Sequence, residues 1–549
     1  MRRHAVPPLL ASLLLLPPVA PLAAQAPDLV LLGGKVFTAD STRPWAEAVA
    51  VRGARIVAVG TTAEVERLAG PRTRRVALGG RTVIPGINDA HDHVGPRFGV
   101  PVVTEPGPEP DPPLAAVLDS VRAAAARTPK GRWLVAYVGM RAVDDTASRL
   151  ARLDAAAPDH PVMLRVSWGH FLQANTRALR AMGITEASRD PVGGWYGRDA
   201  AGRLDGRVQE NAAMVHTRRL WATLPPRAFA DAYRALGDEA LRLGITTVQD
   251  MSEGKSGAAA ARALREAGTP LRVRVVAWPL RAVPGEAAAW DASPARPTPT
   301  SVRSGRKYML DGTPLERLAA QRAPYADRPG WRGRLNYPPD TVRAILAEAL
   351  RRREQVMLHA VGDSTIALVL ATMRALAPDS AWRPLRVRLE HGDWLTGDLL
   401  PTARALGVVL VQNPAHLMLA PGLVAARFGG AQPGFQPLRS TLAAGVPLAF
   451  GSDGPRNPFL NVMFATMHAN NPAEALTREQ AVVAYTRTAA WAEHAEREKG
   501  TLAPGMLADL AVLSQDVFTV PPQALPGTTS VLTLVGGRVA WDAKVLGAR

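Results

Sequence analysis

Two histidines near the end of the first sixth of the chain, His91 and His93, are separated by a single residue. In an extended backbone, residues i and i+2 point to the same side, so both imidazoles can face one point in space. Neutral imidazole is a common ligand of zinc and similar metal ions. A lone pair of this kind also arises by chance or on a surface, so the prediction of a metal site depends on partners elsewhere in the chain.

Such partners follow other short apolar segments. His359 and His391 each close a predicted strand, and Asp453 follows another within Gly451-Ser452-Asp453. The chain has no cysteine, which excludes disulfide bonds and thiolate ligands. Any metal here must therefore be held by histidine, carboxylate or a modified lysine.

Lysine is scarce, and arginine supplies nearly all of the positive charge. The six lysines are Lys35, Lys130, Lys255, Lys307, Lys499 and Lys544. Lys307 stands out because it is expected to begin a buried strand. Arginine stays protonated in proteins, whereas a buried lysine beside cations can lose its proton. An ordinary ion pair of Lys307 with Asp311 or Glu316 is the alternative to a role at a metal site.

Eight short strands, separated mostly by helical patterns, are predicted in the middle of the chain. They are Thr82–Asn88, Ile245–Gln249, Leu271–Trp278, Lys307–Leu310, Val356–His359, Leu385–Glu390, Val408–Gln412 and Pro447–Phe450. This alternation predicts an α/β fold, a (β/α)8 TIM-type barrel with its active site at the carboxyl ends of the strands. Four histidines and an aspartate fall at or just after such ends, which favours one shared site over isolated structural histidines.

Both ends of the chain contain short strands and tight turns, as at Arg52-Gly53 and Gly536-Gly537. We expect residues 27–84 and 501–549 to form one small β-sandwich beside a barrel of residues 85–500. A large insertion after the first strand, about residues 100–240, is expected to cover the mouth of the barrel. Trp168 and His170 in the insertion, and His416 after the seventh strand, are candidate substrate-binding residues.

The first 26 residues predict an export signal. Arg2 and Arg3 precede the apolar run Leu9–Leu16, and Ala24-Gln25-Ala26 matches a signal-peptidase site. The run is short and is broken off by Pro17, Pro18 and Pro21, and no later segment has the roughly 18 uninterrupted apolar residues of a membrane span. We therefore expect a periplasmic or secreted protein, cleaved near Ala26, without a stable membrane span in the mature chain.

The formal charge of +17 would suit an anionic partner, but the basic residues are scattered and not interleaved with aromatic residues. This distribution argues against nucleic acid as a partner. We expect a small-molecule substrate, and the oligomeric state, with a homodimer as one option, stays open.

Taken together, these motifs resemble the amidohydrolase superfamily, and within it amidohydrolase family 3 with its N-substituted formamide deformylase-like enzymes. The matching stretches are Pro-Gly-x-x-Asp-x-His-x-His at 85–93, Lys-x-x-x-Asp-Gly at 307–312, His-Ala-x-Gly-Asp at 359–363, Glu-His at 390–391 and Gly-Ser-Asp at 451–453. The similarity extends over essentially the whole mature chain. Asn88 and Asp92 depart from the usual first motif, and Asp92 is expected to point away from the metals.

The resemblance implies one or two divalent metal ions, usually zinc in similar proteins. His91, His93 and Asp453 would hold one ion, and His359 and His391 the second. Lys307, carboxylated to a carbamate, would bridge the two. The family mechanism is hydrolysis by a metal-activated water, with Asp453 as the catalytic residue that takes up the proton and passes it to the leaving amine.

We therefore expect an exported metal-dependent amidohydrolase that cleaves an amide or formamide-type C–N bond other than an ordinary peptide bond. A cyclic amidase or dipeptidase activity on the same site is an alternative. A mononuclear deaminase-like site would leave Lys307 unmodified. A non-catalytic metal-dependent binding or regulatory protein is disfavoured by the complete ligand set, because a degenerate relative is expected to have lost a ligand.

Overall fold

The centre of the molecule is an eight-stranded parallel sheet that curls into a nearly closed barrel, in the order β20-β19-β18-β17-β16-β15-β14-β8. The computed structural model describes residues 26–96, 111–145, 149–166, 169–252, 257–280, 298, 300–418, 421–430, 432 and 434–547. The barrel strands are β8 (Ile87–Asp92), β14 (Ile245–Ser252), β15 (Arg272–Ala277), β16 (Ser301–Met309), β17 (Val356–Ala360), β18 (Arg388–His391), β19 (Val409–Gln412) and β20 (Leu448–Phe450). The predicted TIM-type barrel is confirmed.

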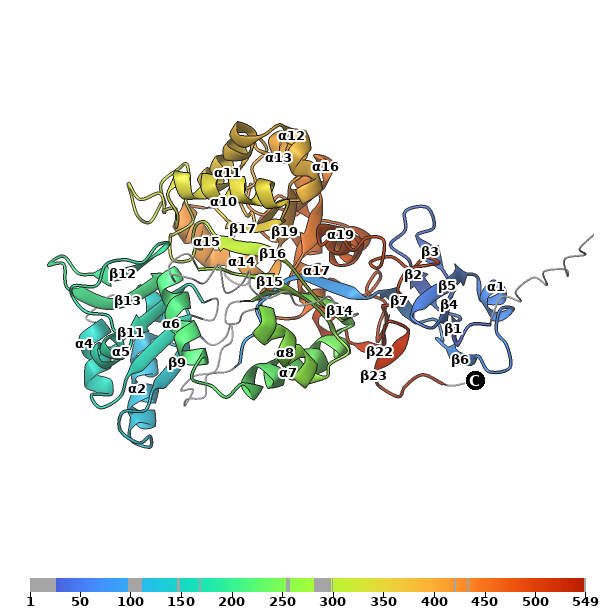
Figure 1. The fold of residues 1–549 in the computed structure, drawn as a ribbon, viewed down its shortest axis with the longest axis horizontal. Coiled ribbons are helices and arrows are strands. Elements are labelled where there is room, and N and C mark those ends of the chain that lie inside the picture. Colours follow the sequence, from blue (N-terminus) through green and yellow to red (C-terminus); the bar gives the residue numbers. More distant parts are fainter. Residues whose placement is uncertain are drawn as a thin grey trace, which may run out of the picture.

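Helices follow most of these strands and surround the sheet (Figure 1). They include α7 (Arg227–Arg242), α8 (Gly257–Ala267), α10 (Pro339–Arg352), α11 (Asp363–Leu376), α13 (Leu400–Leu406), α16 (Leu438–Ala443), α17 (Pro458–Met467), α18 (Arg478–Tyr485) and α19 (Arg487–Ala492). In α10 the buried residues are Val342, Ile345, Leu346 and Ala349, the spacing of a single apolar face. This face packs into the large core that surrounds the barrel.

The predicted strand Thr82–Asn88 is two strands in the structure. β7 (Thr82–Pro85) belongs to a separate six-stranded sheet, and β8 begins the barrel. The Gly86 amide donates to the Asp509 carbonyl at 2.9 Å, and the Ile87 amide donates to the Gly244 carbonyl at 3.0 Å. The chain therefore passes from one sheet to another at Gly86. The prediction of one strand was wrong because the apolar pattern of the sequence continues unchanged across this point.

Lys307 lies near the end of β16, and the prediction that it begins the strand was wrong. β16 starts at Ser301, which pairs with Val273 of β15. The first four residues of β16 are only partly buried or exposed and are mostly polar, so they carry no apolar signal. The longer strand moves Lys307 toward the carboxyl ends, where the neighbouring Met309 pairs with His359.

Both chain ends build two further sheets, which confirms the predicted β-sandwich. One sheet contains β1 (Leu29–Leu32), β4 (Ala48–Arg52), β5 (Arg55–Gly60) and β6 (Arg74–Ala77). The other contains β7 with β2 (Lys35–Phe37), β3 (Trp45–Ala46), β21 (Leu510–Leu513), β22 (Ser530–Val535) and β23 (Arg538–Asp542). In this sheet β21 from the end of the chain pairs antiparallel with β7. Side chains from both sheets share one apolar core.

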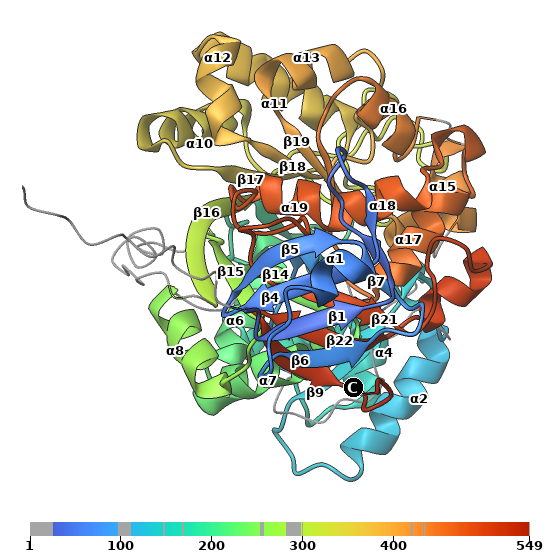
Figure 2. The same cartoon turned by 90° about the vertical axis from the view of Figure 1, so that its right-hand side faces the viewer.

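The insertion after β8 folds around its own five-stranded sheet, in the order β12-β13-β11-β10-β9. Its elements are β9 (Leu134–Val138), β10 (Val162–Val166), β11 (Phe171–Ala174), β12 (Gly194–Arg198), β13 (Leu204–Glu210), α2 (Leu114–Ala125), α3 (Met140–Asp144), α4 (Arg149–Ala156), α5 (Thr176–Ala181) and α6 (Asn211–Trp221). The insertion and the sandwich lie at opposite ends of the barrel (Figure 1), and the sandwich lies in front of the barrel in Figure 2. None of the described helices has the length and apolar character needed to cross a bilayer.

Candidate metal centre

His91 and His93 lie at the carboxyl end of β8, and their Nε2 atoms are 3.3 Å apart. The opposite ring nitrogens are held by the barrel. Nδ1 of His91 donates to the Glu390 carboxylate, and Nδ1 of His93 donates to the Met251 carbonyl at 2.9 Å. Because carboxylates and carbonyls only accept, Nδ1 of each ring carries a proton, and Nε2 is the nitrogen left to face a metal.

Asp453 and His391 complete this side of the centre. Asp453 Oδ1 lies 3.3 Å from His93 Nε2, and Oδ2 lies 3.9 Å from His391 Nε2. His391 is oriented like the first two rings, since its Nδ1 is 2.7 Å from Asn413 Oδ1. The φ angles of His391 and Asp453 are 67° and 48°. Such backbone costs a non-glycine residue about 1–3 kcal/mol and is typical of functional sites.

His359 and His416 both lie next to His391. The ring centroids of His359 and His391 are 4.5 Å apart, and buried His359 Nε2 has no hydrogen-bond partner among the described residues. His416, in α14 (Ala415–Met418), has its Nε2 3.9 Å from Asp453 Oδ2. Two groups of ligand atoms therefore share Asp453, one with His91 and His93 and one with His391 and His416, and each spans no more than 4.8 Å. His416, predicted as a substrate contact, also lies where it could hold a metal.

Lys307 is 1% exposed and lies among these imidazoles. Its Nζ is 3.2 Å from His91 Nε2 and 5.6 Å from the centre of the Trp278 ring. Asp311, one of the carboxylates considered as its ion-pair partner, has another role. It accepts hydrogen bonds from the amides of Val361 and Gly362 at 3.0 and 2.9 Å, which ties the end of β16 to the loop after β17. Burial raises the pKa of Asp311 to about 7.

Three buried imidazoles of the centre are held neutral. Burial lowers the pKa of His91, His359 and His391 well below the usual value, because a low dielectric disfavours the imidazolium form. The nearby Lys307 ammonium and the other imidazoles lower these pKa values further. Converging neutral imidazoles, a carboxylate and an unpartnered His359 nitrogen fit a divalent metal such as zinc.

Contacts between the first and last barrel strands fix the position of Asp453. Asp89 accepts hydrogen bonds from the amides of Ser452 at 2.8 Å and His91 at 3.2 Å. The Asp453 amide donates to the His91 carbonyl at 2.8 Å. A Cβ on Gly451 would lie 2.5 Å from the His91 amide nitrogen, so only glycine allows this approach. Asp92 points away from the centre, toward the Arg456 guanidinium, as predicted.

Glu390 was not predicted to have a role, although the sequence contains a signal for it. Arg388 and Glu390 are two residues apart in a strand, so both point into the barrel. Arg388 donates to both Glu390 oxygens, at 2.6 and 2.9 Å, and the second oxygen receives His91 Nδ1. A carboxylate of this kind fixes the tautomer and orientation of a metal-binding histidine.

An apolar wall borders the centre on the side of His93. The Trp278 ring is 5.4 Å from the His93 ring, centroid to centroid. Trp278 packs in one buried cluster with Met214 of the insertion and with Leu280 and Met309 of the barrel. Such surroundings keep the local dielectric low, which strengthens the electrostatic interactions of the centre.

The insertion contributes His170, whose ring lies 4.9 Å from the His359 ring, centroid to centroid. Its Nδ1 is 3.0 Å from Glu210 Oε2. Burial alone lowers the pKa of His170, but the Glu210 carboxylate outweighs this effect and raises the pKa to about 9. The structure thus brings His170 to the centre. Trp168, the other candidate from the insertion, lies outside the described residues.

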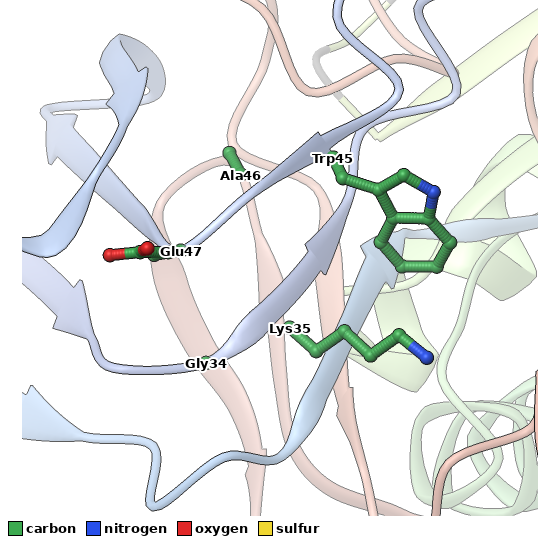
Figure 3. Close-up of a pocket in the computed structure, with 5 residues that line it drawn as sticks. All are labelled: Gly34, Lys35, Trp45, Ala46 and Glu47. Carbon is green, nitrogen blue, oxygen red and sulfur yellow. The ribbon is translucent and has the colours of Figure 1, made fainter.

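A surface hollow on the sandwich contains none of these residues. It is lined by Gly34, Lys35, Trp45, Ala46 and Glu47 (Figure 3). Lys35 lies over the Trp45 ring at 4.9 Å from its centre, and its Nζ is 2.8 Å from Asp516. Its charge is therefore already paired, and the hollow offers no comparable chemistry.

The sequence signature of the amidohydrolase family matches residues 74–540, which include the whole barrel and every candidate ligand. The chain belongs to the amidohydrolase family. It is 27% identical to Protein LONG AFTER FAR-RED 3 of Arabidopsis thaliana over 95% of this chain and 92% of that protein. It is 26% identical to N-substituted formamide deformylase of Arthrobacter pascens over 94% of this chain and 99% of that protein.

Solved structures show the same fold for this amidohydrolase. A metal-dependent hydrolase from Pyrococcus horikoshii superimposes with a TM-score of 0.69 at 20% identity, covering 90% of this chain and 99% of that chain. This chain therefore shares the fold of that hydrolase, and its barrel holds the candidate ligands at the end where TIM-type enzymes carry their active sites.

Proposed function

We propose that this protein is an exported enzyme that hydrolyses a C–N bond of amide or formamide type, other than an ordinary peptide bond. One observation carries the proposal: the Nε2 atoms of His91, His93 and His391 converge on Asp453, while the Nδ1 atoms are held from outside. The similarity to N-substituted formamide deformylase over 99% of that protein supports this type of bond.

The residues that would hold the metals are His91, His93, His359, His391, Lys307 and Asp453. Imidazole and carboxylate ligands suit zinc. A divalent ion bound there would lower the pKa of a water molecule and polarise a carbonyl group. Asp453 takes one proton from the attacking water. When the C–N bond breaks, Asp453 returns this proton to the departing amine nitrogen, so the products are a carboxylic acid and an amine.

We further propose that Lys307 is carboxylated. An ammonium group 3.2 Å from His91 Nε2 and close to the other imidazoles repels any cation bound there. A carbamate on the same nitrogen would turn this repulsion into attraction and would offer oxygen atoms as metal ligands. Export is proposed from the sequence of the first 26 residues, of which 1–25 lie outside the described residues.

Metal content and native intact mass, measured for wild type and Lys307→Ala, test these proposals. We expect two metals per chain and a carbon dioxide adduct in the wild type, and loss of the adduct with a lower metal content in Lys307→Ala. Lys35→Ala, a lysine of the sandwich surface, is the matched control and should keep both. One metal without an adduct would support a mononuclear, deaminase-like site instead.

A screen of amides and formamides with the metal-loaded protein tests the reaction itself. Release of an amine and a carboxylate in equal amounts is expected, and Asp453→Asn should abolish it. A protein that keeps its metals but hydrolyses none of these compounds would overturn the proposed reaction while leaving the metal site in place.

A further inference from the structure

Asp92 stands between the two histidines of the first barrel strand, and its side chain is 4% exposed. It departs from the usual first motif and points away from the metal centre. Its Oδ1 accepts a hydrogen bond from the His93 amide at 2.7 Å. The orientation of the Asp92 side chain therefore affects the backbone that carries the His93 imidazole.

Arg456 holds Asp92 in this orientation. Its Nε donates to Asp92 Oδ2 at 2.5 Å, and its Nη2 donates to Asp92 Oδ1 at 3.1 Å. Two parallel hydrogen bonds of this kind fix the angle of a carboxylate as well as its distance. The Nη1 atom donates to Glu239 Oε2 in α7 at 2.8 Å, so the guanidinium is itself anchored.

Arg456 also belongs to the segment that carries Asp453, which lies three residues earlier in the chain. The φ angles of Asp453 and Gly454 are 48° and 91°, both in the left-handed region. The turn at these two residues brings Arg456 back to the end of β8. One side chain thus joins the segment of Asp453 to the segment of His91 and His93.

These two ligand-bearing segments meet at two places. On the side of the centre, His93 Nε2 lies 3.3 Å from Asp453 Oδ1. On the far side, the Arg456 guanidinium is paired with Asp92. A metal ion held between His93 and Asp453 would close a ring that runs through Asp92 and Arg456.

The pair of Arg456 and Asp92 is shielded from solvent. The side chains are 24% and 4% exposed, compared with 44% and 57% for the surface pair of Arg322 and Asp398. Salt screens a buried pair much less than an exposed one. The pair is therefore able to hold the two segments together at ordinary ionic strength.

We propose that Arg456 is a positioning residue of the metal centre. It binds Asp92 and Glu239, and so fixes the distance between His93 and Asp453 at which one zinc ion is held. The inference rests on the proposed function, because it requires a metal at this centre, and it adds a residue outside the set of ligands. It also gives a role to the departure from the usual motif at Asp92, whose carboxylate is the group that Arg456 binds.

The zinc affinity of the full-length protein, measured by competition with a chromophoric chelator, tests the proposal. We expect Arg456→Gln to raise the Kd for zinc about 10- to 100-fold, the usual effect of changing the outer partners of a metal site. The visible absorption spectrum of the cobalt-substituted protein should also change, because it depends on the arrangement of the ligands. Arg456→Lys keeps the charge but not the planar fork, so its Kd should lie between those of wild type and Arg456→Gln.

Arg272→Gln is the matched control. Arg272 makes the same type of pair with buried Asp509, with Nε 2.6 Å from Oδ2 and Nη2 3.1 Å from Oδ1. It begins β15, at the end of the strand opposite the metal centre. Both glutamine variants should lower the melting temperature of the metal-free protein, but only Arg456→Gln should change the zinc affinity and the cobalt spectrum. An equal loss of zinc affinity in Arg272→Gln would overturn the proposal.

A double variant tests whether Arg456 acts through Asp92. Asp92→Asn combined with Arg456→Gln should raise the Kd for zinc little more than Arg456→Gln alone, because both changes break the same pair. Additive increases would overturn this route. If Arg456→Gln does not fold, Arg456→Lys takes its place, and an unchanged Kd in that variant would overturn the proposal. Wild-type protein that binds no zinc would refute the proposed metal centre, whereas equal zinc affinities of wild type and Arg456→Gln would refute this inference alone.

Discussion

The barrel interior contains two polar layers that differ in how they are satisfied. The lower layer, deeper in the barrel, consists of Arg274, Arg388, Gln249, Gln355 and Asn88. Arg274 donates to Gln249 and Gln355 at 3.1 and 2.7 Å, and Gln249 in turn donates to Asn88 at 3.2 Å. The upper layer is the metal centre, where imidazole nitrogens face one another and His359 Nε2 has no hydrogen bond to any part of the chain that the structure describes.

This difference separates structural polar groups from functional ones. The donors of the lower layer are paired within the protein, although burial and the neighbouring Arg388 charge lower the pKa of Arg274 to about 10. In the upper layer, imidazole nitrogens point toward one another and toward Asp453, an arrangement that suits a bound metal ion. The lower layer is buried, whereas His93, His416 and Asp453 of the upper layer are partly exposed, so internal pairing and solvent access together distinguish the core network from the site.

The largest expected effect comes from breaking the lower layer. Arg388→Leu removes the guanidinium that pairs with both Glu390 oxygens and leaves a buried carboxylate with less compensation. We expect the free energy of unfolding of the metal-free protein to fall by about 3–5 kcal/mol, measured by urea denaturation. Arg322→Leu, which breaks a surface pair with Asp398, is the control. A change below about 1 kcal/mol for Arg388→Leu would contradict the structural role of this layer.

Removing the metal should lower the stability of the folded protein, because the upper layer loses its ligand. A ligand that binds only the folded state stabilises it by about 2.7 kcal/mol at a hundredfold excess over its Kd. We expect chelation to lower the melting temperature and zinc addition to restore it. Equal melting temperatures for the metal-free and the zinc-saturated protein would show that the upper layer is complete without a metal.

Glu390 connects the two layers, and its substitution should act mainly on the upper one. Glu390→Gln keeps the shape of the side chain but weakens its hold on His91 Nδ1. We expect zinc affinity to fall about 10- to 100-fold, the usual effect of losing the outer partner of a metal-binding histidine. Competition with a chromophoric chelator measures this affinity. An unchanged affinity would mean that His91 is oriented by other contacts.

The smallest effect is expected at the sandwich hollow of Figure 3. The pair of Lys35 and Asp516 is partly exposed, with side-chain exposures of 38% and 28%, so solvent screens it. Lys35→Ala should cost about 0–1 kcal/mol of unfolding free energy and leave zinc affinity unchanged. A loss of zinc in this variant would show that the sandwich and the metal centre are coupled.

Much of the fold could be predicted because apolar periodicity is local. The eight barrel strands and the terminal strands are short apolar runs that any window reveals. The two errors, at Gly86 and at Lys307, arise where a strand changes sheets or has a polar first half. The sequence contains no local signal for either.

The site was predictable in its residue types and less so in its pairings. Histidines and an aspartate at strand ends indicate metal chemistry, and the structure brings these side chains together. The partners of His91 and His170, namely Glu390 and Glu210, lie 299 and 40 residues away in the sequence. Such pairings depend on how whole strands pack together, and the sequence of a single strand does not predict this packing.

The connection of β7 to β8 has a consequence for the order in which the protein can be built. β7 leads directly into β8, whose end carries His91 and His93. β21, from the opposite end of the chain, pairs with β7. During synthesis, β7 lacks this neighbour until residues 510–513 have emerged. The pairing of β7 with β21 is thus among the last steps of assembly. The metal centre on β8 gains the support of this sheet only after the end of the chain has been made.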